Sequence, residues 1–328
     1  MTNPDSKIEG GGSVEAETAR HDVRGTSGAA PVGAMDRLYE AVAKRGHVCV
    51  GLDTAVDHLP AQVRAAYPSP TAAILAYNRA IISATADFAA CFKVQIAYYE
   101  EHGVEGLRVY AETLRLIRSR GLVAIADIKR GDIADTATRY VRAHLSGDFE
   151  ADCVTLNPYM GLDSIEPWLV EAEKRGKGLF ALVRTSNPGM RDFQGLELAK
   201  GGRVYDEVAR RFSALSTRGR GSHGYGALGA VVGCTERSEA AAIRERLSGV
   251  FILIPGYGAQ GGAAEDAALL LADGNGGIVN ASRSILKAWS TAGLDSASTG
   301  LEEAAAAAGR AAREMRDAIG LAAGMRTP

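Results

Sequence analysis

One apolar run of the sequence ends in a group of charged residues that lie within six positions of one another. The stretch LVAIADIKRGDIADT (residues 122–136) begins like a buried β-strand and then presents Asp127, Lys129 and Asp132. Burying such charges costs free energy unless they pair with one another or act on a bound molecule. In a strand, Asp127 and Lys129 would point to the same face, where opposite charges can form charge-assisted hydrogen bonds. The stretch therefore predicts either a structural ion-pair network or a catalytic array at the end of a strand.

Eight apolar runs of strand type alternate with stretches of helical character. The runs cover residues 47–53, 91–97, 122–129, 153–158, 179–186, 227–235, 250–258 and 277–284. They are largely continuous rather than alternating, which is typical of parallel strands covered on both faces. Eight such units suit a (β/α)8 TIM barrel of about 250 residues, although a doubly wound open sheet gives a similar pattern. The count of eight and the polar residues at the strand ends favour a single-domain α/β barrel.

Several of these runs end in polar or charged residues. Asp53 ends the first run, Lys93 lies within the second, Asn157 ends the fourth, and Thr185 and Ser186 end the fifth. In a barrel the carboxyl ends of all strands meet around one mouth, and the active sites of such barrels lie there. We therefore expect these side chains to surround the same site as the charges after the third run.

A second group of residues is suited to phosphate. The segment PGYGAQGG (residues 255–262) ends the seventh run, and NASRS (residues 280–284) ends the eighth. A glycine-rich loop exposes backbone N–H groups, and a following helix N-terminus adds its dipole. Gln260 would add a side-chain hydrogen-bond donor, and the planar guanidinium group of Arg283 could donate two parallel hydrogen bonds to the phosphate. Because barrels often bind phosphate after strands seven and eight, we expect a phosphate site here; the alternative is a flexible connector with a surface arginine.

The composition excludes several classes of protein. The net charge is −2, and no basic block is interleaved with aromatic residues, so nothing indicates nucleic-acid binding. No apolar run approaches the roughly 18 residues of a membrane span, and the N-terminus does not resemble a secretion signal. The four separated cysteines indicate free thiols in a reducing cytoplasm, and the scattered histidines predict no metal site.

The first part of the chain differs from the rest in composition. Residues 1–33 are rich in Gly, Ser, Thr and charge and contain little that could be buried. Such segments do not gain enough from burial to offset the entropy of ordering. We therefore expect a disordered leader over residues 1–33 and the barrel domain over residues 34–328.

Four motifs in this order resemble one enzyme family. DIKRGDIADT, LVRTSNPG, GYGAQGG and ASRS together are similar to orotidine 5′-phosphate decarboxylase, in particular to its longer bacterial branch (type 2). The resemblance spans roughly residues 36–286 and implies the conversion of orotidine 5′-phosphate to UMP and CO2 in de novo pyrimidine biosynthesis. It also implies a cytoplasmic enzyme that needs no cofactor and no metal.

The resemblance also implies roles for individual residues. Members of this family use an alternating Lys-Asp-Lys-Asp array, which matches Lys93, Asp127, Lys129 and Asp132. Lys129 would donate the proton to C6 of the pyrimidine, and Asp127 would face the substrate carboxylate. Without a cofactor as electron sink, the electrons left at C6 must be stabilised by preorganised charge. The four charges are expected to titrate as a coupled unit.

Binding residues follow from the same resemblance. Asp53 and Lys93 would hold the ribose hydroxyls, Ser186 the pyrimidine edge, and Gln260 with Arg283 the phosphate. The family works as homodimers with shared sites, so Asp132, Ile133 and Thr136 would reach into the active site of the partner subunit. One departure is Ser282, where a glycine often precedes the arginine in other family members.

Three alternatives remain open at this point. A Mg²⁺-dependent sugar-phosphate decarboxylase or aldolase of the same superfamily would need a further acidic ligand, and Asn157 at the fourth strand end argues against one. A Schiff-base aldolase would need an unprotonated lysine, which flanking carboxylates disfavour. A non-catalytic nucleotide-binding barrel would use Gln260 and Arg283 but has no need of four alternating charges.

Overall fold

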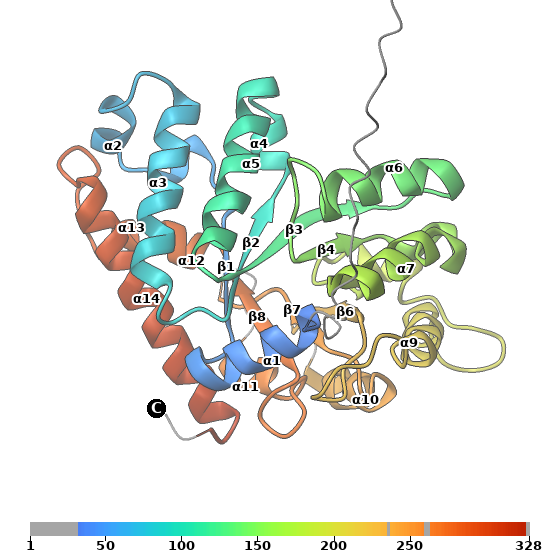
Figure 1. The fold of residues 1–328 in the computed structure, drawn as a ribbon. Coiled ribbons are helices and arrows are strands. Elements are labelled where there is room, and N and C mark those ends of the chain that lie inside the picture. The colour runs from blue at the N-terminus through green and yellow to red at the C-terminus, as the bar shows by residue number, and fades with distance from the viewer. Residues whose placement is uncertain (1–31, 235–236, 259–262, 326–328) are drawn as a thin grey trace, which may run out of the picture. The chain divides into compact units, whose positions relative to one another are not determined.

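Eight parallel strands close into a barrel in the computed structural model, which describes residues 32–234, 237–258 and 263–325. Each strand pairs with the next along the chain, and β8 pairs with β1 (Figure 1). The strands are β1 Val48–Gly51, β2 Cys91–Gln95, β3 Val123–Arg130, β4 Cys153–Leu156, β5 Gly178–Arg184, β6 Leu228–Val232, β7 Ile252–Ile254 and β8 Gly277–Ala281. The predicted (β/α)8 barrel is confirmed, and the open-sheet alternative is wrong.

Helices connect the strands and cover the outside of the barrel (Figure 1). The α-helices are α1 Ala34–Arg45, α2 Ala61–Ala65, α3 Pro70–Thr85, α4 Ala97–Glu100, α5 Gly103–Ser119, α6 Ala134–Leu145, α7 Glu166–Arg175, α8 Met190–Phe193, α9 Val204–Leu215, α10 Arg237–Arg246, α11 Ala264–Ala268, α12 Arg283–Leu286, α13 Ala288–Thr291 and α14 Leu301–Ala322. Three short 3-10 helices are η1 Val56–His58, η2 Pro158–Met160 and η3 Leu162–Ser164. Among these described helices, none is long and apolar enough to cross a membrane.

The strands are buried on both faces, as their apolar runs predict. One cluster of buried side chains fills the space between the strands and the outer helices. A second cluster fills the barrel interior and includes Ile125 of β3, Cys153 of β4 and Phe251. Helix α1 contributes Met35 and Leu38 to this inner cluster, so it packs against the interior of the barrel rather than its outside.

The last helix, α14, packs directly against α3, as Figure 1 shows for the red helix α14 and the light blue helix α3. The two backbones approach closely at Gly309, where a Cβ atom would lie 2.8 Å from the carbonyl oxygen of Ala84. The absence of a side chain at Gly309 therefore allows the two helices to approach this closely. The predicted leader falls almost entirely on residues 1–31, which lie outside the described residues, so its boundary stays a prediction.

Candidate active site

An ionic cluster lies at the carboxyl ends of β1, β2 and β3. The ammonium nitrogen of Lys93 donates to Asp127 Oδ2 at 2.7 Å and to Asp53 Oδ1 at 3.3 Å. Lys129 Nζ donates to the other oxygen of Asp127, Oδ1, at 2.6 Å. We call Asp53, Lys93, Asp127 and Lys129 the ionic array. The register of β2 and β3 explains how Lys93 contacts Asp127. Lys93 pairs with Ile125, two residues before Asp127, so its long side chain extends toward the mouth of the barrel and meets the Asp127 carboxylate.

The array combines burial with alternating charge. Lys93 and Asp127 are each 5% exposed. Burial alone lowers the pKa of Lys93, but the carboxylates of Asp127 and Asp53 outweigh it and raise that pKa above its ordinary value. Burial alone raises the pKa of Asp127, but the ammonium groups of Lys93 and Lys129 outweigh it and lower that pKa well below its ordinary range. Both groups are therefore charged at neutral pH, and each keeps the other so.

A threonine of β4 completes the surroundings of Asp127. The hydroxyl of Thr155 donates to Asp127 Oδ1 at 2.8 Å and accepts from the backbone N–H groups of Ile128 and Lys129, both at 3.0 Å. The pairing of β3 with β4 is irregular at this point, and Lys129 has a φ of 42°, in the left-handed region. Thr155 was not among the predicted site residues; the available signal was a polar residue at the third position of the apolar run CVTLNP.

Ser282 contacts Asp53, the member of the ionic array that follows β1. Its hydroxyl donates to Asp53 Oδ2 at 2.9 Å, so the residue that departs from the family pattern has a contact of its own. This contact depends on Gly51 of β1, because a Cβ atom there would lie 1.9 Å from Ser282 Oγ. Asn280 Nδ2 donates to the same hydroxyl at 3.4 Å. Asp53 is thus held between Lys93 and Ser282.

The predicted partner-facing residues lie away from the array in this chain. Asp132 Oδ1 accepts from the N–H of Ile133 at 2.8 Å, and no ion pair of Asp132 is present among the described residues. Ile133 and Thr136 are exposed at the start of α6. The array of one chain therefore contains Asp53 in addition to Lys93, Asp127 and Lys129, and does not contain Asp132.

The remaining predicted site residues take several positions. Ser186 is half-buried just beyond β5 and packs against Gly233. A Cβ atom at position 233 would lie 2.8 Å from the Cβ atom of Ser186. Arg283 is exposed as the first residue of α12. Gln260 lies outside the described residues. The amide oxygen of Asn157, which had no assigned role, accepts from the N–H of Tyr159 at 3.1 Å and so caps η2.

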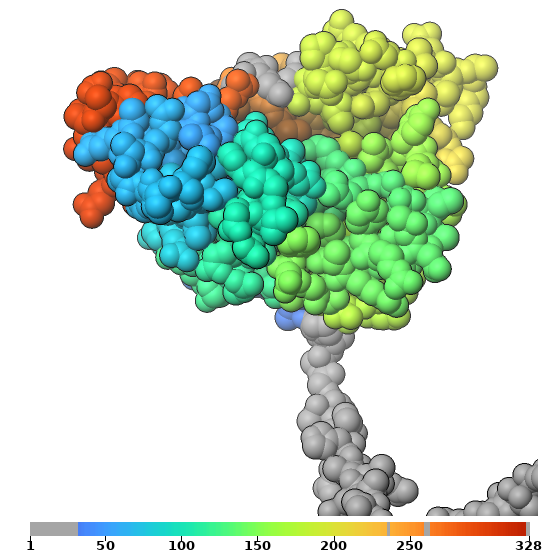
Figure 2. All heavy atoms as spheres, turned by 90° about the horizontal axis from the view of Figure 1, so that it is seen from above, coloured from blue at the N-terminus to red at the C-terminus, as the bar shows by residue number. Residues whose placement is uncertain are grey.

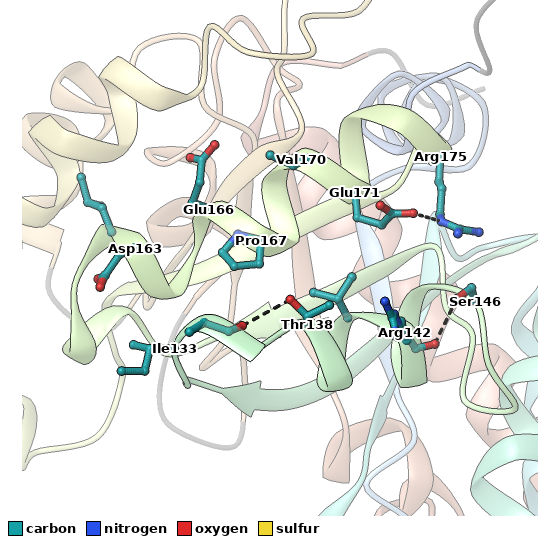
Figure 3. A pocket seen from close by; sticks show the side chains of 13 residues that line it. Ile133, Thr138, Arg142, Ser146, Asp163, Glu166, Pro167, Val170, Glu171 and Arg175 are labelled. Atoms are coloured by element: carbon teal, nitrogen blue, oxygen red, sulfur yellow. Dashed lines mark hydrogen bonds and ion pairs between the residues drawn. The ribbon is translucent and has the colours of Figure 1, made fainter. Parts of the chain in front are cut away.

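A groove of about 960 Å³ lies between α6 and α7 (Figure 3). It begins at Ile133 and Ala134, directly after Asp132, and continues along Thr138 and Arg142 of α6. The opposite wall comes from η3 and α7, including Asp163 and Pro167, and Figure 3 shows the two walls side by side. None of the ionic array lines this groove, so it is a separate surface and not the chemical centre.

The fold and the array define a (β/α)8-barrel enzyme with an ionic site at the carboxyl ends of its strands. Residues 46–292 match the model of the "Orotidine 5'-phosphate decarboxylase / HUMPS family". The orotidine 5′-phosphate decarboxylase of Clostridium kluyveri is 51% identical over 255 residues, which cover 78% of this chain and 88% of that protein. That of Clostridium perfringens is 52% identical over 254 residues, with 77% and 88% covered. The chain belongs to the orotidine 5′-phosphate decarboxylase family and is a carboxy-lyase.

A solved structure agrees with this assignment. The OMP decarboxylase of Leishmania donovani superposes with a TM-score of 0.70 at 29% identity, over 90% of this chain and 100% of that one. Although the family description also includes HUMPS, the relatives that are about half identical are orotidine 5′-phosphate decarboxylases. The Mg²⁺-dependent sugar-phosphate alternative is therefore not favoured.

Proposed function

We propose that this chain converts orotidine 5′-phosphate to UMP and CO2 at the ionic array, with Lys129 as the proton donor to C6. The observation that carries the proposal is the buried Asp127 carboxylate, which lies between two ammonium groups, Lys93 at 2.7 Å and Lys129 at 2.6 Å. The Lys129 side chain is the more exposed of the two, at 45%. It is therefore the ammonium group that a bound pyrimidine can reach.

The chemistry follows from the charges. The bond between C6 and the substrate carboxylate breaks, CO2 leaves, and the electron pair of that bond stays on C6. The ammonium group of Lys129 stabilises this developing charge and then transfers a proton to C6, after which solvent reprotonates the amine. Asp127 faces the substrate carboxylate, and the repulsion between the two is relieved as CO2 departs. Because Lys93 and Thr155 hold Asp127 in place, it does not turn away from that contact.

The rest of the substrate would bind around the mouth of the barrel. Asp53 and Lys93 hold the ribose hydroxyls, Ser186 the pyrimidine edge, and Arg283 with Gln260 the phosphate. Support comes from the position of Asp53, whose oxygens already face Lys93 and Ser282 at the same end of the barrel. Binding energy from the remote phosphate can hold the pyrimidine against the unfavourable contact with Asp127.

The proposal includes a homodimer with shared sites. Apolar side chains are exposed on the loops that follow the strands, among them Ile133 at 44%, Tyr159 at 84% and Phe193 at 65%. The rings of Tyr159 and Phe193 lie 6.5 Å apart, so they form one surface. Exposed apolar patches of this kind mark interfaces. Asp132 and Thr136, on either side of Ile133, would then reach the site of the partner subunit.

A cytoplasmic location is also part of the proposal. Cys49, Cys91, Cys153 and Cys234 are all buried and unpaired. Free thiols persist where the compartment is reducing. A location in the cytoplasm would also suit an enzyme of pyrimidine biosynthesis.

The proton-donor role of Lys129 is tested by Lys129→Ala. General acids typically contribute about 10²- to 10⁴-fold to a rate, so we expect kcat for orotidine 5′-phosphate to fall at least about 10³-fold, followed as loss of ultraviolet absorbance with EDTA present. The matched control is Lys44→Ala on α1, an exposed lysine at a distance from the array. A wild-type protein without turnover would overturn the decarboxylase proposal, and full activity of Lys129→Ala would overturn the proton-donor role alone.

A further inference from the structure

Thr155 faces an unusual stretch of the neighbouring strand. Ala126 of β3 pairs with Val154 of β4, and Arg130 pairs with Leu156. Four steps along β3 therefore match two steps along β4, and Thr155 alone stands opposite three residues, Asp127 to Lys129. Regular ladder hydrogen bonds cannot form there, because the two strands are out of step.

The hydroxyl of Thr155 takes the place of the missing backbone hydrogen bonds between β3 and β4. It accepts from the N–H groups of Ile128 and Lys129 at 3.0 Å each and donates to Asp127 Oδ1 at 2.8 Å. A hydroxyl has one donor proton and two acceptor lone pairs, so all of its capacity is used. Because both lone pairs receive N–H groups, the proton of the hydroxyl points to Asp127. The residue is 1% exposed, so water does not compete for these bonds.

The same bonds stabilise an unfavourable backbone conformation at the proposed proton donor. Lys129 has a φ of 42°, which costs free energy for a residue with a Cβ atom. The Thr155 hydroxyl bonds the N–H of this residue, and the Lys129 side chain returns to Asp127 Oδ1 at 2.6 Å. One hydroxyl therefore contacts both the backbone that directs Lys129 and the carboxylate to which Lys129 is paired.

We propose that Thr155 is a positioning residue for decarboxylation, which sets the direction of the Lys129 ammonium group and prevents Asp127 from rotating away from the substrate carboxylate. Asp127 Oδ1 receives Thr155 and Lys129, and Oδ2 receives Lys93, so both of its oxygens are held. This inference rests on the proposed roles of Lys129 and Asp127. It assigns to Thr155 an effect on the reacting geometry rather than on substrate affinity.

The test compares Thr155→Val, which removes the hydroxyl at nearly constant shape, with Thr155→Ser, which keeps it. We expect Thr155→Val to lower kcat about 10- to 100-fold while KM for orotidine 5′-phosphate and Kd for UMP change less than about threefold. Thr155→Ser should stay within about threefold of wild type in kcat. The matched control is Thr85→Val in α3, where a buried hydroxyl donates to the carbonyl of Ile81 at 2.7 Å; it should leave kcat unchanged.

Three results would overturn the proposed positioning role of Thr155. Wild-type kcat in Thr155→Val overturns the proposal, as does an equal loss in Thr155→Ser, which would assign the effect to packing of the methyl group. A rise in KM with unchanged kcat would assign Thr155 to substrate binding and overturn it too. If Thr155→Val shows no cooperative thermal unfolding, Thr155→Cys replaces it, and its weaker donor should give an intermediate kcat. An inactive wild-type enzyme would instead overturn the decarboxylase proposal itself.

Discussion

At the level of single side chains, the site places charge where burial makes charge costly. Asp127 has a lowered pKa although burial opposes this, because Lys93 and Lys129 both contact its oxygens. Removing one member of a buried ion pair leaves the other uncompensated, which typically costs about 3–5 kcal/mol. The array should therefore contribute to stability as well as to chemistry, and its contribution should depend on pH.

Asp127→Asn is expected to lower the free energy of unfolding by about 3 kcal/mol near neutral pH, because Lys93 loses its closest carboxylate. A carboxyl group whose pKa is lowered on folding stabilises fully above its unfolded value and loses this effect as the pH falls toward the folded value. The difference between wild type and Asp127→Asn should thus be constant from about pH 5 to 8 and shrink below the ordinary value of 3.8. Urea unfolding across this range measures it.

The control for this series is Asp148→Asn, an exposed aspartate, which should change the unfolding free energy by less than about 0.5 kcal/mol at every pH. The titration of Lys93 does not contribute to the change in unfolding free energy at acid pH. Its pKa is raised on folding, so its contribution is complete below its ordinary value of 10.5 and is lost only at higher pH. A difference that does not depend on pH would show that the Asp127 effect is not electrostatic.

Among the secondary-structure elements, α1 has a structural role that could not be predicted from its position before the first strand. It packs Met35 and Leu38 against the side chains that fill the barrel interior. Asp36 of the same helix accepts from the N–H groups of Ser222 and His223, which ties the loop before β6 to it. The helix therefore belongs to the core and lies apart from the ionic array.

Leu38→Ala is expected to destabilise the protein by about 2–5 kcal/mol, because it removes a fully buried side chain from the inner cluster. Its kcat for orotidine 5′-phosphate should stay near that of wild type at temperatures where the variant is folded. Thermal or urea unfolding measures the first effect and the ultraviolet assay the second. The exposed Lys44→Ala on the same helix is the control and should change neither. A stable Leu38→Ala variant would mean that α1 does not support the barrel.

For the whole molecule, barrel closure brings residues far apart in sequence to one site. Asp53 and Ser282 are joined only because β8 pairs with β1. Seen from above, the blue, teal and green segments that follow β1, β2 and β3 succeed one another in chain order (Figure 2). The proposed dimer would extend this arrangement, since the exposed Ile133 lies directly after Asp132, whose proposed role depends on a second copy.

Ile133→Asp is expected to shift the proposed dimer toward monomer, because it places a charge in an apolar interface. If Asp132 completes the partner's site, kcat/KM should fall at least about tenfold along with the dimer. Analytical ultracentrifugation and the ultraviolet assay at matched concentrations measure the two effects. Leu321→Asp is the matched control, since Leu321 is equally apolar, is 83% exposed and lies at the end of α14. A monomeric variant with full activity would contradict the shared site.

Much of the fold was predictable because burial on both faces leaves a simple pattern. Each of the eight continuous apolar runs coincides with one strand of the barrel, although β3 and β5 each extend one residue beyond their runs. The proximity of Asp127 and Lys129 was predictable from their spacing in one strand, and the structure places their side chains in contact. The position of Gln260 stays a prediction because it lies outside the described residues, and the roles of the site residues stay proposals.

The sequence by itself determined the number and order of the strands and the charges that follow them, since these depend on local hydrophobicity and spacing. Only the tertiary structure decided which groups meet across strands. Thr155 reaches Asp127 because β3 and β4 fall out of step, and Ser282 reaches Asp53 because Gly51 leaves room for it. Such contacts depend on register and barrel closure, which are set by packing of the whole chain and leave no periodic trace in any one segment.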